Sequence, residues 1–316
     1  MKPVLPALLS AALAATVLSA PAWAQDAHGA HTTEMNSDHG HHHANFDSGR
    51  FHVRIDGPEQ PQGDVILIPG LSSSPHVWDM LTEELKGRYR VHRIHVQGFA
   101  GAPAKDNATG PVSAPVAEDI ARYIQEQGLE KPAVIGHSMG GTIGMMLAAR
   151  HPDAVGKLMV VDMIPFMGAM FGPPGATPES VAPTAEMIYQ GMSSASREEW
   201  LAQSGASITG MINTEARRAG PLEDGANTDQ KVAASAMREL VVTDLRPELD
   251  EITAPTTVLY VTFNAPGMTP EVTDGIYRAS FANLSGATLK RIDDSAHFIM
   301  LDQPEVFAAE VNAFLE

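Results

Sequence analysis

From about residue 50 onward, short apolar runs alternate with longer segments that have helical periodicity. The apolar runs predict strands at Phe51–Ile55, Val65–Ile68, Val91–Val96, Ala133–Ile135, Leu158–Val161, Thr257–Val261 and Ala287–Ile292. Helical spacing is clearest in Val116–Gln127, Thr142–Arg150 and Pro304–Leu315. Strands that alternate with helices pair in parallel and carry helices on both faces. The pattern therefore predicts an α/β fold with a mostly parallel central sheet.

The alternation stops between Asp162 and about Leu245, where polar helix-forming residues, Pro and Gly replace the strand-like runs. We expect a mostly helical insertion over about residues 163–245, packed on the sheet. It contains seven methionines: Met163, Met167, Met170, Met187, Met192, Met211 and Met237. Because methionine is unbranched and adaptable, these residues could line a surface that accepts varied apolar ligands. The alternative is that they only pack the insertion against the sheet.

The N-terminus has the pattern of a secretory signal peptide over residues 1–24. One positive charge at Lys2 precedes the apolar run Val4–Leu18, and a small-residue motif ends at Ala24. A membrane anchor is the alternative, but a proline and a serine interrupt the run, which is shorter than the ~20 apolar residues that span a bilayer. We therefore expect a periplasmic or secreted protein without stable membrane anchoring.

Residues 25–49 form a polar, histidine-rich stretch ahead of the domain expected at 50–316. Its histidines are His28, His31, His39, His41, His42 and His43. Apolar residues are few and show no period, which predicts a flexible, solvated leader. A loose metal-binding tail is the alternative, because histidine-rich tracts can bind metal ions.

The charge balance narrows the choice of partners. The chain has 21 basic and 38 acidic residues, a net charge of −17. Such a surface argues against nucleic acid and anionic lipid as partners. Cysteine is absent, which excludes disulfides and thiol chemistry.

A candidate nucleophile lies in the motif GHSMG, residues 136–140. A strand-like run precedes Ser138 and a helix-like segment follows it. In a sharp strand-to-helix turn, small residues on both sides let the backbone fold tightly beneath an exposed serine. The motif alone is weak, but this context predicts that Ser138 is a nucleophile.

Four segments together resemble the α/β-hydrolase superfamily, in its serine esterase and lipase-like branch with a cap. They are ILIPGLSSSPHVW, HVQGFAGAPA, GHSMGG and DDSAHFIMLDQPEVFAAEVNAFL. Two departures occur: Pro69 replaces the usual histidine, and Val96 or Gln97 replaces an acidic residue. The resemblance implies the α/β-hydrolase fold, with the insertion as a helical cap.

The resemblance also implies a base and an anion pocket. His297 follows the last predicted strand and precedes the terminal helix, the position of the base in this fold. The backbone N–H groups of Met139 and Leu71 are expected to bind the oxyanion. For Leu71, the alternative is an ordinary turn at Gly70 before a helix.

The sequence offers several candidates for the acid that orients His297. Asn264 stands where many members of the superfamily carry the acid, and an amide cannot offset the charge of imidazolium. Asp162, after the strand that follows the motif, occupies a second acid position and is preferred. Asp274 and Asp294 are weaker alternatives, and a structural role for Asp162 is the competing interpretation.

These features predict an exported serine hydrolase that cleaves a small-molecule carboxylic ester or lactone through an acyl-enzyme, without cofactor or metal. Two alternatives stay open. One is a C–C bond hydrolase of the same fold, and the other is a non-catalytic binding protein, since a fold alone does not establish a function.

Overall fold

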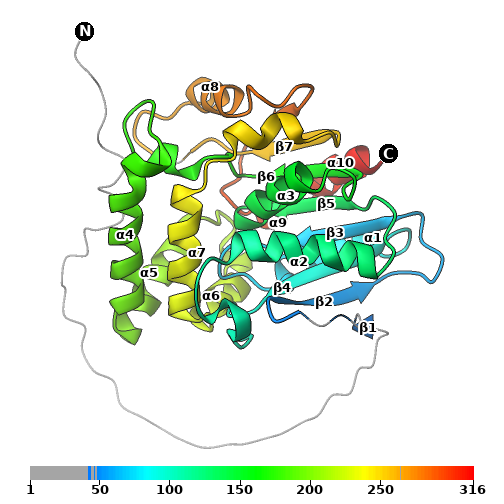
Figure 1. The fold of residues 1–316 in the computed structure, drawn as a ribbon, viewed down its shortest axis with the longest axis horizontal. Helices are drawn as coiled ribbons and strands as arrows, with labels where there is room; N and C mark the ends of the chain where they lie inside the picture. Colours follow the sequence, from blue (N-terminus) through cyan, green and yellow to red (C-terminus); the bar gives the residue numbers. More distant parts are fainter. Residues whose placement is uncertain (1–41, 44–45, 47, 264) are drawn as a thin grey trace, which may run out of the picture.

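The structure is a computed structural model that describes residues 42–43, 46, 48–263 and 265–316. The expected signal peptide, most of the leader and Asn264 lie outside the described residues. Elements are labelled as in Figure 1.

A single sheet organises the described residues. Its strands are β1 (His42–His43), β2 (Phe51–Asp56), β3 (Asp64–Ile68), β4 (Arg90–Val96), β5 (Ala133–His137), β6 (Lys157–Val161), β7 (Thr256–Tyr260) and β8 (Thr288–Arg291). Their spatial order is β1-β2-β4-β3-β5-β6-β7-β8. In that order, every pair from β4 to β8 is parallel. The β1–β2 and β2–β4 pairs are antiparallel. Each strand predicted from the sequence is present, and the predicted fold is confirmed.

Helices cover both faces of this sheet (Figure 1). They are α1 (Asp79–Leu85), α2 (Ser113–Glu126), α3 (Met139–Arg150), α8 (Pro270–Ser280), α9 (Ile299–Asp302) and α10 (Pro304–Leu315), with 3-10 turns η1 (Pro75–Trp78), η2 (Lys105–Ala108) and η5 (Arg246–Glu251). Side chains alternate along β3: Ile66 joins the core beneath α2 and α3, and Leu67 joins the core beneath α1 and α10. This two-sided burial explains why the parallel strands read as continuous apolar runs. None of the helices in the described residues is long and apolar enough to cross a membrane.

Between β6 and η5, the described elements are all helical. They are η3 (Met167–Met170), α4 (Pro178–Ser194), α5 (Arg197–Gly210), η4 (Glu215–Arg217), α6 (Ala219–Ala226) and α7 (Gln230–Val242). Figure 1 shows α4 to α7 side by side at its left, where the parallel strands end. We call residues 163–245 the cap.

Carboxylates fasten the cap to the sheet domain. Asp224 on α6 accepts the backbone N–H of Ser74 at 2.8 Å. Glu239 on α7 accepts three backbone N–H groups from residues 112–114, at the start of α2, at 2.7 to 2.9 Å. Bonds from an ionised carboxylate to the free N–H groups of a helix start are among the stronger hydrogen bonds. The cap is therefore joined to the sheet domain by polar ties as well as by packing.

Contacts with the sheet begin within the segment expected to be a free leader. His42 and His43 pair with β2. The Phe46 ring packs edge-on against Tyr123, with centroids 5.1 Å apart. The Ser48 hydroxyl donates to Asp119 at 2.7 Å. The packed part of the chain thus starts before residue 50.

Candidate active site

Ser138 lies in a strained turn between β5 and α3, with φ 55° and ψ −123°. There is no room for side chains on either side. A Cβ at Gly136 would lie 2.1 Å from the Gly140 carbonyl oxygen, and one at Gly140 would lie 2.1 Å from the Ile68 carbonyl oxygen. The Ser138 N–H donates to the Val161 carbonyl at 2.9 Å. The two glycines let the backbone pass this closely, which is the geometry expected beneath an exposed nucleophile.

His297 lies in the loop between β8 and α9 and is bonded to Asp162, at the end of β6. Its Nδ1 is 2.6 Å from Asp162 Oδ2, and the Asp162 side chain is only 5% exposed. Because an ionised carboxylate only accepts hydrogen bonds, Nδ1 carries the proton and donates it. In the neutral ring this leaves Nε2 free to accept a proton, as a general base requires.

The other oxygen of Asp162 is held from two sides. Its Oδ1 accepts the backbone N–H of Val261 at 3.1 Å and the hydroxyl of Tyr277 at 3.0 Å. Burial, together with the adjacent Asp162 carboxylate, raises the pKa of Tyr277 well above its usual range. Tyr277 therefore stays protonated and keeps donating. Sequence reasoning missed Tyr277, because it lies on α8, far along the chain from Asp162.

The other acidic candidates do not contact His297. Asp274 accepts hydrogen bonds from the Tyr260 hydroxyl at 3.0 Å and from Arg291 at 2.9 Å. Asp294 is exposed at a left-handed turn with φ 56°. Asn264 lies outside the described residues. Among the described acidic side chains, Asp162 is thus the one that bonds to the imidazole.

A second histidine, His137, contacts His297 through a hydrogen bond and ring packing. His137 is fully buried, and its Nε2 donates to the backbone carbonyl of His297 at 3.0 Å. The two rings pack with centroids 4.5 Å apart. Burial lowers the pKa of His137 well below its ordinary value, so the ring is neutral. The sequence assigned His137 no role, whereas the structure shows it beneath His297.

The expected oxyanion donors adjoin Ser138. A Cβ at Gly70 would lie 3.1 Å from the Ser138 Cβ, so the loop that carries Leu71 passes against the serine. Met139 is the first residue of α3, where backbone N–H groups have no partner within the helix. Its side chain is buried in the core, so any contribution to the site comes from its backbone.

Asp302, at the end of α9, connects the His297 loop to the cap. Its Oδ2 accepts the N–H groups of Ala296 at 2.9 Å and Asn213 at 3.0 Å, and its Oδ1 accepts that of Thr214 at 2.8 Å. One carboxylate therefore holds the residue before His297 against the cap. Such a bond between distant segments has no local sequence signal.

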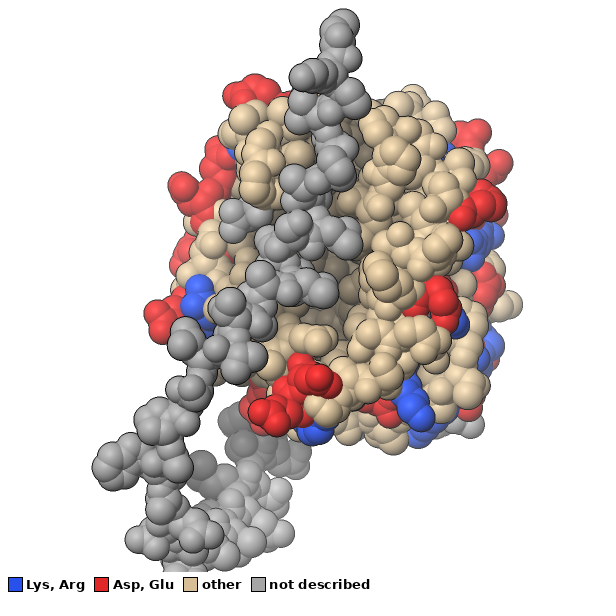
Figure 2. All heavy atoms as spheres, turned by 90° about the vertical axis from the view of Figure 1, so that its left-hand side faces the viewer, with Lys and Arg blue, Asp and Glu red and all other residues tan. Residues whose placement is uncertain are grey.

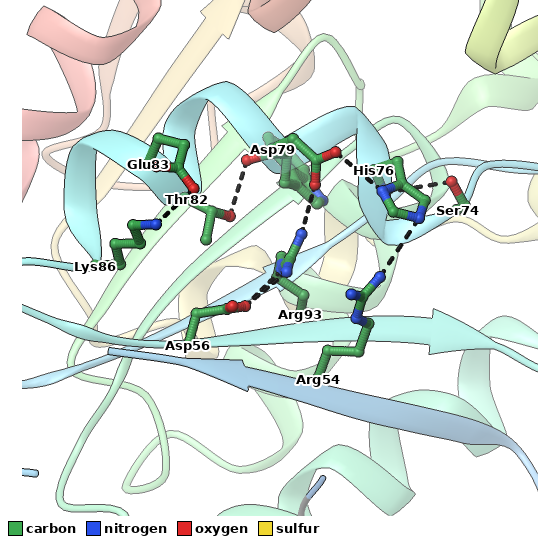
Figure 3. Close-up of polar contacts among 10 residues, drawn as sticks. Arg54, Asp56, Ser74, His76, Asp79, Thr82, Glu83, Lys86 and Arg93 are labelled. Atoms are coloured by element: carbon green, nitrogen blue, oxygen red, sulfur yellow. Dashed lines mark hydrogen bonds and ion pairs between the residues drawn. The ribbon is translucent and has the colours of Figure 1, made fainter. Parts of the chain in front are cut away.

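A buried arginine of the sheet forms an ion pair with the helix that follows the Leu71 loop (Figure 3). Arg93 on β4 is 4% exposed and lies 2.6 Å from both Asp56 and Asp79. Asp79 also pairs with His76 at 2.9 Å, a hydrogen bond that raises the pKa of His76. These bonds hold η1 and α1 to the sheet. The loop that carries Leu71, just before η1, is therefore fixed at its C-terminal end.

Ser138, His297 and Asp162 line one cavity of about 900 Å³ between the sheet and the cap. Leu71 also lines it. The methionines in its wall are Met163, Met167, Met170, Met192, Met211, Met237 and Met268. Of the seven expected from the sequence, Met187 is the exception, on the outer surface and 58% exposed. The described residues include no cluster of His, Asp and Glu that could hold a metal ion.

The fold is that of the alpha/beta hydrolase family. The sequence profile of that family matches residues 65–310, and the chain belongs to it.

Individual similar proteins share only a modest fraction of identical residues with this chain. The chain is 22% identical over 258 residues to the pimeloyl-(acyl-carrier protein) methyl ester esterase of Pectobacterium carotovorum, covering 80% of this chain and 94% of the relative. A match at 34% identity, to a protein of Caulobacter sp. (strain K31), spans 114 residues, 36% of this chain and 42% of that protein. The enol-lactonase of Burkholderia xenovorans LB400 superimposes with a TM-score of 0.67 at 22% identity, covering 86% of this chain and 99% of that structure.

Proposed function

We propose that this protein is a serine hydrolase that cleaves a carboxylic ester or lactone through an acyl-enzyme. The observation that carries the proposal is the 2.6 Å bond between His297 and Asp162, in the same cavity as the strained Ser138. The esterase and the lactonase among the similar proteins support this class of substrate.

In the proposed mechanism, Ser138 Oγ attacks the substrate carbonyl while His297 Nε2 takes its proton. The N–H groups of Leu71 and Met139 bind the resulting oxyanion; one such donor is worth about 10²–10³ in rate. Asp162 stabilises the imidazolium. His297 then protonates the leaving alcohol. In the second step, His297 takes a proton from water as the water oxygen attacks the acyl carbon, and the imidazolium returns that proton to Ser138 Oγ as the acyl–Oγ bond breaks and the acid leaves. With a lactone, the leaving alcohol remains part of the acyl chain, and the product is a hydroxy acid.

A fluorophosphonate probe tests the nucleophile. Such a probe phosphonylates an activated serine, so the wild-type protein should be labelled at Ser138 and should hydrolyse para-nitrophenyl esters. Ser138→Ala should lose both properties, because only the hydroxyl is removed. Ser207→Ala is the matched control, since Ser207 lines the same cavity, and it should keep both.

Two outcomes would contradict the proposal. A folded wild-type protein that binds esters but is neither labelled nor active would be a binding protein. Faster hydrolysis of a vinylogous diketone than of any ester or lactone would instead indicate C–C bond cleavage.

We also propose that the protein is exported. The support is the N-terminal pattern of residues 1–24. Mass spectrometry of the protein from a periplasmic fraction should give Gln25 as the first residue. Recovery of the intact N-terminus from the cytoplasm would contradict export.

A further inference from the structure

The described residues of the cavity wall include neither lysine nor arginine. Among its described residues, the ionisable groups are His137, Asp162, Tyr277 and His297. Burial keeps His137 neutral by lowering its pKa, and burial keeps Tyr277 protonated by raising its pKa. Neither Lys nor Arg is present in this described lining. Asn264, between lining residues 263 and 265, is uncharged.

The carboxylates that brace the cavity wall have the same sign as Asp162. Asp224 accepts the N–H of Ser74, next to the lining residue Ser73. Asp302 accepts the N–H groups of Ala296 and Asn213, and both of these residues line the cavity. Arg218 also donates to the backbone carbonyl of the lining residue Asn213 at 3.3 Å, so charges of both signs lie behind the wall. An anionic group inside the cavity would therefore have no described Lys or Arg on the wall itself to pair with.

The remaining surface of the cavity is largely apolar. Of its seven methionines, only Met163 is buried, at 5% exposure. Met170 and Met211 are 39% and 40% exposed. Exposed apolar surface gathered in one place is typical of a binding site, and flexible thioether side chains adapt to chains of different shape. Where the face that carries α4 is visible in Figure 2, it is mostly uncharged, and charged residues lie toward its edges.

We propose that the cavity selects acyl groups that are uncharged and apolar along their length and rejects acyl chains that end in a carboxylate. This inference rests on the proposed function. Burying an unpaired carboxylate is costly because the charge loses its hydration and gains no partner. A neutral chain has no such penalty and covers the methionine surface. The volume of about 900 Å³ lies within the range of small-molecule sites and leaves room for such a chain.

A matched pair of esters tests the selection. Para-nitrophenyl hexanoate and the mono-para-nitrophenyl ester of adipic acid have acyl chains of equal carbon number, and only the second ends in a carboxylate. For the wild-type protein, we expect kcat/KM to be on the order of 10²-fold higher for the hexanoate. Para-nitrophenyl acetate serves as a reference ester that fills little of the cavity.

A cation placed in the cavity wall should weaken the selection. Met170→Lys adds an ammonium group at a lining position that is already partly exposed. We expect the hexanoate to adipate ratio to fall by about tenfold or more, mainly through faster hydrolysis of the adipate ester. Met187→Lys is the matched control, because Met187 lies on the cap outside the cavity lining. It should leave the kinetics of all three esters unchanged.

The outcomes separate the two proposals. Equal kcat/KM values for hexanoate and adipate, with normal probe labelling, would overturn the selection and leave the hydrolase intact. Loss of labelling and of all ester hydrolysis in the folded wild-type protein would overturn the proposed function itself. An equal change of the ratio in Met170→Lys and Met187→Lys would show that general surface charge, and not the cavity wall, sets the preference.

Discussion

The two sides of the cavity are built in opposite ways. One side, which we call the floor, comprises the turn at Ser138, Asp162 and the His297 loop, where the proposed reaction takes place. There, added Cβ atoms would lie 2.1 Å from backbone carbonyls, and hydrogen bonds fix the side chains. The other side, the methionine roof, comprises the cap methionines of the cavity wall. Except for the buried Met163, these flexible side chains have accessible surface. Chemistry needs atoms fixed in place, whereas recognition of an apolar chain needs a surface that can adapt.

Backbone strain follows the same division. Ser138 and Asp162, at the ends of neighbouring strands, both have positive φ, at 55° and 50°. Such conformations cost about 1–3 kcal/mol each in non-glycine residues and persist where surrounding bonds hold them. In the cap, residues 163–245, which are all described, no residue other than glycine has positive φ. Among the described residues, positive φ outside glycine thus occurs in the sheet domain and not in the cap, both at the proposed site and away from it, as at Ala100, Lys105 and Lys131.

The largest expected effect is on kcat, and it comes from removing the negative charge of Asp162 in the floor. Asp162→Asn preserves the shape of the side chain but cannot stabilise imidazolium, so kcat should fall by about 10³–10⁴. Asp274→Asn is the matched control, because that carboxylate is bonded to Tyr260 and Arg291. It should retain near-normal kcat. Steady-state kinetics on protein shown to be folded by its thermal midpoint measures both.

The competing interpretation gives Asp162 a structural role only. It predicts a lower thermal midpoint for Asp162→Asn but ordinary turnover in the folded protein. Near-normal kcat in that variant would remove Asp162 from the proposed triad.

Alanine substitution of glycines should have an intermediate effect, on the free energy of unfolding, and the effect should differ between the floor and the cap. Gly140→Ala would place a Cβ 2.1 Å from the Ile68 backbone carbonyl, so the backbone must shift and several kcal/mol of stability should be lost. Gly191, near the end of α4, has no heavy atom within 4 Å of an added Cβ. Gly191→Ala should stabilise the protein by about 0.5–1 kcal/mol. Urea unfolding of both variants checks the contrast, and equal losses would contradict it.

The sequence predicted the sheet and the Ser138 turn well, for a physical reason. Strands buried on both faces appear as continuous apolar runs, and a turn with no space for side chains requires glycine at fixed spacing. Both signals are local. The strands, the helical nature of residues 163–245 and the strained turn at Ser138 could therefore be read directly from the chain.

The partners of the site residues could not be predicted in this way. Tyr277 reaches Asp162 from α8, and Asp302 reaches Asn213 from α9. Each bond joins segments that only the folded sheet brings together, so neither has a sequence pattern of its own. For the same reason, the sequence could offer Asp162, Asp274 and Asp294 as candidates but could not show which one lies beside His297.

The smallest expected effect concerns the buried histidine beneath the floor. The pKa of His137 is far below the ordinary value of 6.5 in the folded protein. Below about pH 6.5, the unfolded chain therefore binds a proton at this residue that the folded protein does not bind. Stability falls as the pH decreases through this range, by up to about 1.4 kcal/mol per pH unit from this group.

The variant His137→Gln isolates this contribution. Its amide can still donate toward the His297 carbonyl, but it does not titrate. Urea unfolding of both proteins at pH 7.5, 6.5 and 5.5 gives the difference in their free energies of unfolding. Effects of other groups, such as the raised pKa of His76 and the lowered pKa of His95, are shared by both proteins and cancel. The wild-type protein should lose more stability than the variant at pH 5.5. If the difference in free energy of unfolding stays constant with pH, His137 accepts a proton in the folded state. The His137 ring would then be more accessible to water than its burial implies.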